Sequence, residues 1–284
     1  MRKKMCYNYS AAVCRYAFWE VPKMLFHLFH RRRYEDICEF KRLSDRGILV
    51  FFADEIDSTN AEARRWAESG GKAPVIFVAD RQTAGRGRLG RSFYSPSDTG
   101  IYMTLLLEIG EDFPDTAGLT SAAAVAVLRG TDRLTRGKTQ IKWVNDILLD
   151  GKKICGILAE SFLVGDKTYA AIGIGVNVST KDFPEDIRGI AGSIGKRVDR
   201  TKIFERIACE LYDLCLCASR GDRLYMQEYR ERSAVLGKRV TFLKDGIASE
   251  GIATDIDDDG ALCVELDNGE KVTLSGGEIT LRLK

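Results

Sequence analysis

The sequence predicts an α/β (α+β) protein: a layered domain with a mixed β-sheet, followed by a small all-β domain. Three observations support this prediction. Between residue 47 and about residue 235, apolar runs typical of buried strands are interspersed with segments of helical periodicity. Several of the strands follow one another with no helix between them, which favours antiparallel or mixed pairing. After residue 237 the pattern changes to short strands separated by KDG, DDDG and DNG, which is typical of a small β-barrel.

The layered domain begins with two buried strands and a helix between them. Residues 48–52 (ILVFF) and 74–80 (PVIFVAD) have the apolar pattern of strands, and residues 58–71 have that of a helix. Ser58 or Thr59 is expected at the N-cap of this helix, because both are favoured there.

The remaining elements of the layered domain extend to a boundary near residue 235. Strands are predicted over 101–109, 141–163 and 168–178, and helices over 118–137, 201–218 and 222–232. The Asp-Gly pair at 150–151 is a strong hairpin signal and divides the segment 141–163 into separate strands. The predicted organisation is therefore an N-terminal extension (1–46), the layered domain (47–235) and the C-terminal domain (236–284).

Composition excludes several classes of protein. A formal net charge of +2 is too near balance for a protein that coats a polyanion, so no nucleic-acid partner is expected. Eight scattered cysteines without a C-x-x-C pair, and no clear export signal, favour reduced thiols and a cytoplasmic location. The only histidines, His27 and His30, argue against a zinc site or a Ser-His-Asp triad. No apolar run is long enough for a transmembrane segment.

Four short segments carry groups suited to binding, and the first is DSTN, residues 57–60. At a junction between strand and helix, these residues serve either as a helix cap or as small hydrogen-bonding groups for a polar head group.

The second segment is QTAGRGRLGRSF, residues 82–93. Its glycines bring backbone N–H groups close to a ligand, and Arg86 and Arg88 match phosphate or carboxylate oxygens. It is not a P-loop, because no G-K-[ST] follows. A solvated turn and an RNA-binding arm are the alternatives to an anion clamp.

The third segment is KWVND, residues 142–146, followed by GKKICGILAE. Lys142 and Lys153 lie on successive segments of the predicted hairpin and are expected to face one pocket, where buried lysines need an anion. Asn145 and Asp146 offer oxygen ligands of the kind that Mg²⁺ prefers. The alternative is an edge strand with its lysines in water.

The fourth segment is GIGVNV, residues 173–178. Gly173 and Gly175 within an apolar strand indicate that something packs flat against the backbone there. A β-bulge would explain the same two glycines.

In this order and spacing, DSTN, RQTAGRGRLGR, KWVNDILLDGKKICGILAE and GIGVNV resemble the catalytic core of the biotin–protein ligases, the biotin–[acetyl-CoA-carboxylase] ligase family. The closing GEITLR resembles that family's C-terminal SH3-like barrel, and the resemblance covers residues 48–284. It implies a catalytic domain related to class II aminoacyl-tRNA synthetases. It also implies a reaction in two steps: ATP and Mg²⁺ convert biotin to biotinyl-5′-AMP, and biotin then passes to a lysine of a biotin carboxyl carrier domain.

The resemblance implies roles for individual residues. Those that would bind biotin are Ser58, Thr59, Asn60, Gln82, Arg86, Gly87, Arg88 and Lys153. Those that would bind ATP or the adenylate are Gly85, Arg86, Arg88, Lys142, Asn145 and Asn177. The candidate Mg²⁺ ligands are Asn145 and Asp146, and the candidate catalytic residues are Arg86, Arg88, Lys142 and Lys153.

Two related functions are the alternatives. A lipoate–protein ligase shares the fold, but the pairing of GRGRLGR with KWVND and GKKICGILAE favours biotin. A biotin-sensing transcriptional repressor would need a DNA-binding domain in residues 1–46, which lack two plainly periodic helices and contain Pro22. The protein partners left open are a carrier domain of acetyl-CoA carboxylase or a similar carboxylase, and a second copy in a homodimer.

Overall fold

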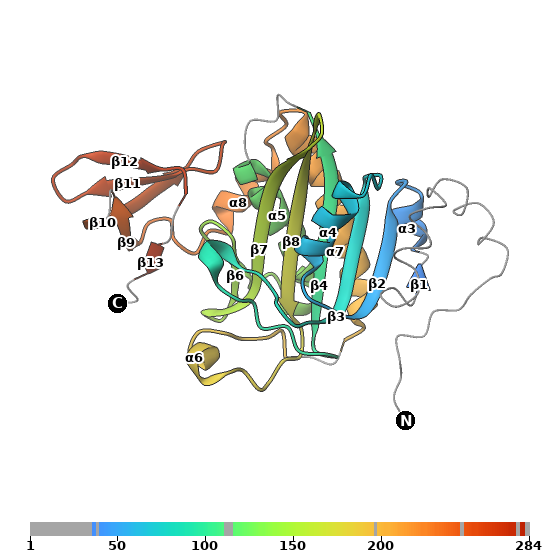
Figure 1. Ribbon diagram of the computed structural model, residues 1–284. Helices are drawn as coiled ribbons and strands as arrows, with labels where there is room; N and C mark the ends of the chain where they lie inside the picture. Colours follow the sequence, from blue (N-terminus) through green and yellow to red (C-terminus); the bar gives the residue numbers. More distant parts are fainter. Residues whose placement is uncertain are drawn as a thin grey trace.

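The computed structural model describes residues 36–37, 40–110, 116–195, 198–244, 247–276 and 279–281. Most of the predicted N-terminal extension lies outside these residues. The described chain forms an eight-stranded sheet with helices on both faces, followed by a separate five-stranded sheet (Figure 1). Within the described ranges, no helix combines the length and apolar character needed to cross a membrane.

The strands of the large sheet are β1 (Asp36–Ile37), β2 (Leu49–Ile56), β3 (Val75–Gln82), β4 (Gly100–Ile109), β5 (Gln140–Lys142), β6 (Asp146–Leu149), β7 (Lys152–Val164) and β8 (Lys167–Asn177). The helices are α3 (Lys41–Ser44), α4 (Thr59–Glu68), α5 (Thr116–Thr135), α6 (Glu185–Arg188), α7 (Arg200–Ser219) and α8 (Tyr225–Glu231), with a 3₁₀ turn, η1 (Arg88–Gly90). The predicted strands and helices are confirmed, whereas β1, α3 and α6 were not predicted.

The order of strands in the large sheet is β1-β2-β3-β4-β8-β7-β6-β5. β2 and β3 pair in parallel because α4 carries the chain back between them, and the other described pairs are antiparallel. The predicted mixed sheet is thus confirmed. Asp150 and Gly151 join β6 to β7 with φ values of 49° and 76°, the two positive angles that a tight hairpin turn requires.

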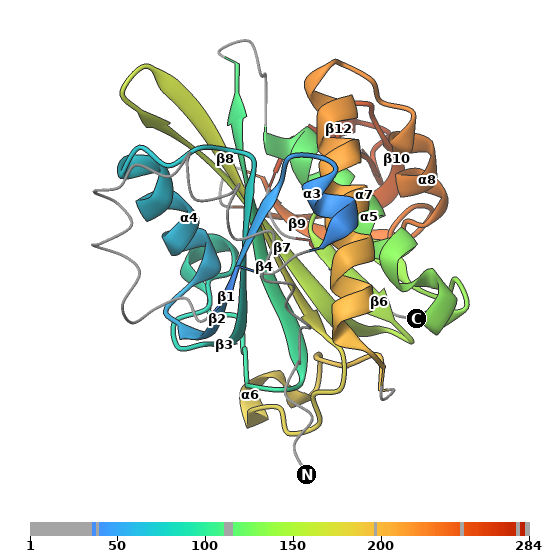
Figure 2. The ribbon, with the colours of Figure 1, turned by 90° about the vertical axis from the view of Figure 1, so that its right-hand side faces the viewer.

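Helices cover the two faces of the large sheet unequally. α4 lies on one face, and α3, α5, α7 and α8 lie on the other (Figure 2). Because both faces are buried, successive residues of β3 enter different cores: Ile76 packs on the α5 side and Phe77 on the α4 side. This explains why the strands have continuous apolar runs rather than alternation.

The packed unit starts earlier than the predicted residue 47. Phe40 and Leu43, at the start of α3, are buried. The Phe40 ring packs edge-on against Phe204 of α7, with centroids 5.0 Å apart. Arg46 pairs with Asp213 of the same helix at 2.7 Å. Phe40 and Leu43 therefore belong to the core of the layered domain.

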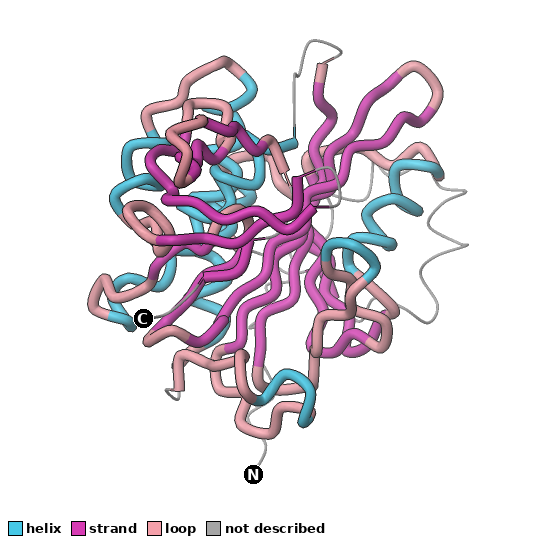
Figure 3. Tube along the Cα trace, turned by 90° about the vertical axis from the view of Figure 1, so that its left-hand side faces the viewer, coloured by secondary structure: helices cyan, strands magenta, loops and turns pink. Residues whose placement is uncertain are grey.

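The C-terminal sheet contains β9 (Arg239–Lys244), β10 (Ile247–Ile256), β11 (Leu262–Leu266), β12 (Lys271–Leu274) and β13 (Ile279–Leu281), in the order β12-β11-β10-β9-β13. Its pairs are antiparallel, and the prediction of short strands after residue 237 is confirmed. Figure 3 views the molecule with this sheet in front. It contacts the layered domain where Trp143 Nε1 donates to the Gly260 carbonyl at 2.8 Å and where Arg230 pairs with Asp258.

Candidate active site

One cavity of about 270 Å³ brings the four predicted segments together. The predicted residues that line it are Ser58, Thr59, Asn60, Gln82, Arg86, Gly87, Arg88, Lys142, Asn145, Asp146, Lys153 and Asn177. The cavity lies on the face of the sheet that α4 covers, beyond the N-terminus of that helix, where Gly173 and Gly175 of β8 form part of its floor. Residues as far apart in sequence as Ser58 and Asn177 thus share one pocket.

The junction of β2, α4 and β3 supplies uncharged polar groups. The backbone N–H and hydroxyl of Thr59 both donate to Gln82 Oε1, at 2.9 and 3.1 Å, and Gln82 Nε2 donates to the Ser95 hydroxyl at 3.0 Å. Ser58 occupies the N-cap position of α4, but its side chain makes no capping hydrogen bond. Of the two interpretations of DSTN, this geometry favours hydrogen-bonding groups that face the pocket.

The side-chain amide of Asn60 forms hydrogen bonds with groups of two strands. Its Oδ1 accepts from the buried Thr104 hydroxyl at 2.7 Å, and its Nδ2 donates to the Leu158 carbonyl at 3.2 Å and to Glu160 at 2.9 Å. A side chain at Gly173 would collide with this amide. Asn60 is therefore the group that packs flat against β8 at Gly173.

Phe93, at the end of the segment 82–93 (the Gly/Arg loop), packs against the second glycine of β8. A Cβ at Gly175 would overlap the Phe93 ring, and one at Gly156 would lie 3.1 Å from it. Pairing between β4 and β8 runs without interruption from Gly100 to Ile109, so the β-bulge interpretation is wrong. Sequence reasoning missed Phe93. The available signal was a pair of glycines two residues apart, which leaves space for an aromatic ring.

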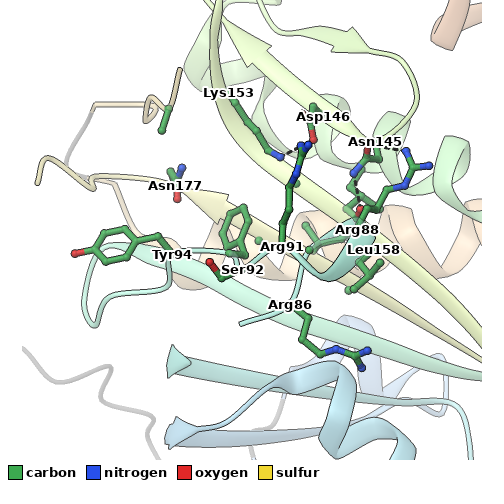
Figure 4. A pocket seen from close by; sticks show the side chains of 18 of the residues that line it. Arg86, Arg88, Arg91, Ser92, Tyr94, Asn145, Asp146, Lys153, Leu158 and Asn177 are labelled. Atoms are coloured by element: carbon green, nitrogen blue, oxygen red, sulfur yellow. Dashed lines mark hydrogen bonds and ion pairs between the residues drawn. The ribbon is translucent and has the colours of Figure 1, made fainter. Parts of the chain in front are cut away.

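The opposite side of the pocket, formed by β5, β6 and β7, is charged. Lys153 Nζ lies 2.7 Å from Asp146 Oδ1, and Arg88 donates to Asn145 Oδ1 at 3.3 Å (Figure 4). Lys142 and Lys153 both line the pocket, as predicted. They do not lie on successive strands, however, because β6 lies between β5 and β7. The turn before β6, at residues 143–145, contains neither Gly nor Pro and was therefore not recognised in the sequence.

The Gly/Arg loop is itself a short hairpin. Phe93 N–H donates to the Gly85 carbonyl at 2.8 Å, and Gly87 N–H donates to the Arg91 carbonyl at 2.7 Å. Gly85 is buried in this pairing and is not among the residues that line the cavity, so its predicted contact with nucleotide has no support from this geometry. Arg91, which was not predicted, extends toward Asp146 (Figure 4). The arginines of this loop thus point to different places.

A segment after β8 closes another side of the pocket. Phe183, Ile187, Ile190 and Ala191 line the cavity, and none of them was predicted. This segment is fixed to β7 because Lys153 N–H donates to the Ile190 carbonyl at 2.8 Å. It carries no motif, and its four-residue helix is too short for a periodic signal.

Asn177, at the end of β8, carries a buried acceptor. Its Nδ2 donates to the Gly192 carbonyl at 3.1 Å, whereas its Oδ1 is buried without a hydrogen-bond partner. An unsatisfied buried oxygen is costly, so a donor from a ligand would stabilise it. Elsewhere in the pocket, the acidic and amide oxygens at 145–146 are the available metal donors. In the described ranges, no group of three or more His, Cys, Asp or Glu could hold a metal ion.

Comparison with known proteins identifies the class. The chain matches the Biotin/lipoate A/B protein ligase family over residues 52–177 and the Biotin protein ligase C terminal domain over residues 235–282. It is 34% identical over 240 residues to a protein of Bacillus spizizenii named Bifunctional ligase/repressor BirA, a match that covers 79% of this chain and 72% of that protein. It is also 34% identical over 233 residues to the Biotin--[acetyl-CoA-carboxylase] ligase of Mycobacterium tuberculosis, with coverage of 78% and 85%.

Solved structures agree with the sequence matches. The fold is similar to that of a biotin protein ligase from Aquifex aeolicus in complex with biotin and ATP, with a TM-score of 0.70 and 27% identity. That match covers 83% of this chain and 99% of the other. The chain therefore belongs to the biotin/lipoate A/B protein ligase family, and it is a ligase.

Proposed function

We propose that the protein activates biotin with ATP to form biotinyl-5′-AMP and then transfers biotin to a lysine of a biotin carboxyl carrier domain, such as that of acetyl-CoA carboxylase. The observation that carries this proposal is that the pocket has one uncharged polar side and one positively charged side. Uncharged hydrogen-bonding groups come from the β2–β3 side, cations come from the β5–β7 side, and the glycines of β8 lie between them.

The chemistry of biotin matches these two sides. Its ureido head is neutral and both donates and accepts hydrogen bonds, as Ser58, Thr59 and Gln82 can. Its valeryl chain ends in a carboxylate, which needs a cation. Lipoate has an apolar dithiolane ring instead of a ureido group, so it would bring no hydrogen-bonding groups to this polar side of the pocket, which disfavours it. The relatives named as biotin ligases, and the Aquifex aeolicus complex with biotin and ATP, support the same choice.

In the first step, a carboxylate oxygen of biotin attacks the α-phosphorus of ATP, and pyrophosphate leaves. This reaction joins two anions, so catalysis depends on positive charge and alignment rather than on a nucleophilic side chain. Lys153 would contact the biotin carboxylate, while Arg88 and Lys142 would contact phosphate oxygens. The unpaired Oδ1 of Asn177 would accept a hydrogen bond from the adenine amino group.

In the second step, the amine of the carrier lysine attacks the carbonyl carbon of the mixed anhydride, and AMP leaves. The tip of the Gly/Arg loop would cover the anhydride and exclude water. Gly87, whose backbone lines the pocket, lets this loop approach the ligand closely.

Mg²⁺ fits the donors present. Asp146 and Asn145 are adjacent, and both line the cavity. Proteins commonly hold Mg²⁺ through one or two carboxylates together with substrate phosphates and water. Asp146, with Asn145 Oδ1 beside it, would hold the ion, and the ion would neutralise charge on the phosphates.

The finer fold assignment is part of the same proposal. We assign the layered domain to the class II aminoacyl-tRNA synthetase-like group and the C-terminal sheet to the SH3-like barrels, with the boundary near residue 235. A cytoplasmic location agrees with ATP as a substrate.

The proposal is tested by incubating the protein with ATP, Mg²⁺ and either biotin or lipoate, and by detecting the adenylates by mass spectrometry. Biotinyl-5′-AMP is the expected product, at a far higher kcat/KM than lipoyl-AMP. Absence of adenylate with biotin, or preference for lipoate, would contradict the proposal.

A further inference from the structure

We infer that Glu160 is a positioning residue that fixes the base of the Gly/Arg loop through Arg86 and leaves the tip, residues 88–90, as the part that moves over the ligand. Glu160 does not line the cavity and carries no predicted role. Its effect on catalysis rests on the proposed function, whereas its effect on the loop does not.

Glu160 joins two segments that are far apart in sequence. It lies on β7, on the same face as the pocket residues Gly156 and Leu158, because alternate residues of a strand share a face. Its carboxylate accepts from Asn60 Nδ2 at 2.9 Å and lies 3.2 Å from an Arg86 guanidinium nitrogen. One partner begins α4, and the other lies in the Gly/Arg loop.

The Asn60 side of this connection is rigid. Asn60 is 6% exposed, and its amide is also bound to Thr104, which is fully buried. The Glu160 side chain is only 25% exposed, so its charge is partly desolvated and requires donors. Arg86, half exposed in the loop, supplies the cationic donor. The connection therefore runs from the core to the loop.

The backbone of the loop also consists of a hydrogen-bonded base and an exposed tip. Thr83 and Ala84 donate to the carbonyls of Ile56 and Asp57, both at 2.9 Å, so the base is joined to the end of β2. The tip has less support: Leu89 is 73% exposed, and its φ is 55°. Segments with few buried contacts open at low free energy, so the tip is the part able to move.

The arginines of the loop consequently have different tasks. The Arg86 guanidinium points away from Lys153 and Asp146, whereas Arg88 reaches Asn145 at the charged side of the pocket (Figure 4). Arg86 anchors the loop, and Arg88 at its tip is free to exchange a single 3.3 Å contact for ligand oxygens.

The test is Glu160→Gln, which retains an acceptor for Asn60 and removes the charge that binds Arg86. The matched control is Glu108→Gln, which removes an exposed ion pair with Lys167 on the same sheet. Hydrogen exchange of residues 82–87 is measured by mass spectrometry in ligand-free protein. We expect exchange to become roughly 2- to 5-fold faster in Glu160→Gln, as for loss of a partly exposed ion pair, and to stay unchanged in the control.

Kinetics and a second variant complete the test. The KM for biotin should rise roughly 2- to 5-fold in Glu160→Gln, with a smaller change in kcat, because the loop must be positioned before it closes. Arg86→Met removes the same pair from the exposed side and should reproduce both effects, and the double variant should be no worse than Arg86→Met alone. Unchanged exchange at 82–87 in both single variants would overturn the inference, and so would additive effects on KM. The hydrogen-exchange result does not depend on the proposed function, because exchange is measured without ligand.

Discussion

Replacing Lys153 with alanine removes the cation that we place next to the biotin carboxylate. Lys153 Nζ lies 2.7 Å from Asp146 Oδ1, and a third of its side chain is exposed to the cavity and solvent. A charge-assisted hydrogen bond contributes roughly 1.5–3 kcal/mol, or about 10- to 150-fold in affinity. Biotin affinity without ATP should fall by that factor. Adenylation should fall at least as much, because charge stabilisation is strongest in the transition state.

The ion pair between Lys153 and Asp146 also predicts how substitutions of Asp146 change biotin affinity. In Lys153→Ala the Asp146 carboxylate loses the ion pair with Lys153 and repels the ligand anion. Adding Asp146→Asn to Lys153→Ala should therefore recover part of the biotin affinity. Asp146→Asn alone should not weaken biotin binding when nucleotide is absent, because Lys153 is then released from its ion pair.

The assay is calorimetric titration with biotin, followed by separate measurement of adenylation and of transfer from chemically supplied biotinyl-5′-AMP. Transfer should suffer less than adenylation, because the supplied adenylate bypasses the first step. Lys167→Ala, which loses only the exposed pair with Glu108 at 3.0 Å, is the control and should bind biotin normally. Unchanged biotin affinity in Lys153→Ala would place Lys153 away from the biotin carboxylate.

Three further predictions concern packing and protonation. Gly175→Ala forces the neighbouring aromatic ring of the loop out of place, at a cost of about 1–3 kcal/mol, and should raise the KM for biotin. Gly189→Ala is the control, because a Cβ there meets open space, and it should leave the KM unchanged. Equal KM values for the two variants would contradict this prediction. A chain that begins at Asp45 lacks the buried Phe40 and should melt well below a chain that begins at residue 39, by roughly 3–5 kcal/mol of stability; coincident melting curves would show that α3 is dispensable. Burial raises the pKa of the Cys155 thiol well above its ordinary value, so iodoacetamide at pH 8 should label it only after unfolding, and labelling of the folded protein would contradict its burial.

Local signals predicted most of the fold. The Asp150–Gly151 turn, the buried runs of β3 and β8 and the periodicity of α7 are properties of neighbouring residues, and each occurs where it was expected. α3 was not predicted, because a single turn of helix has no period to detect. The burial of Phe40 depends on α7, which lies far along the chain.

In the candidate site, too, local motifs were predicted from the sequence, whereas residues placed by tertiary contacts were not. Residues in compact motifs, such as Thr59, Arg88 and Lys153, all line the cavity. Phe93 and the segment 183–191 were missed, because their places depend on tertiary contacts with Gly175 and with β7. The partners of Asn60 could not be read from sequence either, since Thr104 and Glu160 come from two other strands.

Attachment of biotin to a carrier lysine is measured by the intact mass of a carrier domain after incubation with the protein, ATP, Mg²⁺ and biotin. The carrier should gain the mass of one biotinyl group, only when ATP is present, and a carrier with its target lysine replaced by arginine should gain nothing. A parallel reaction with lipoate should leave the carrier unmodified. A carrier that stays unmodified with biotin, or that gains a lipoyl group instead, would contradict the proposed function.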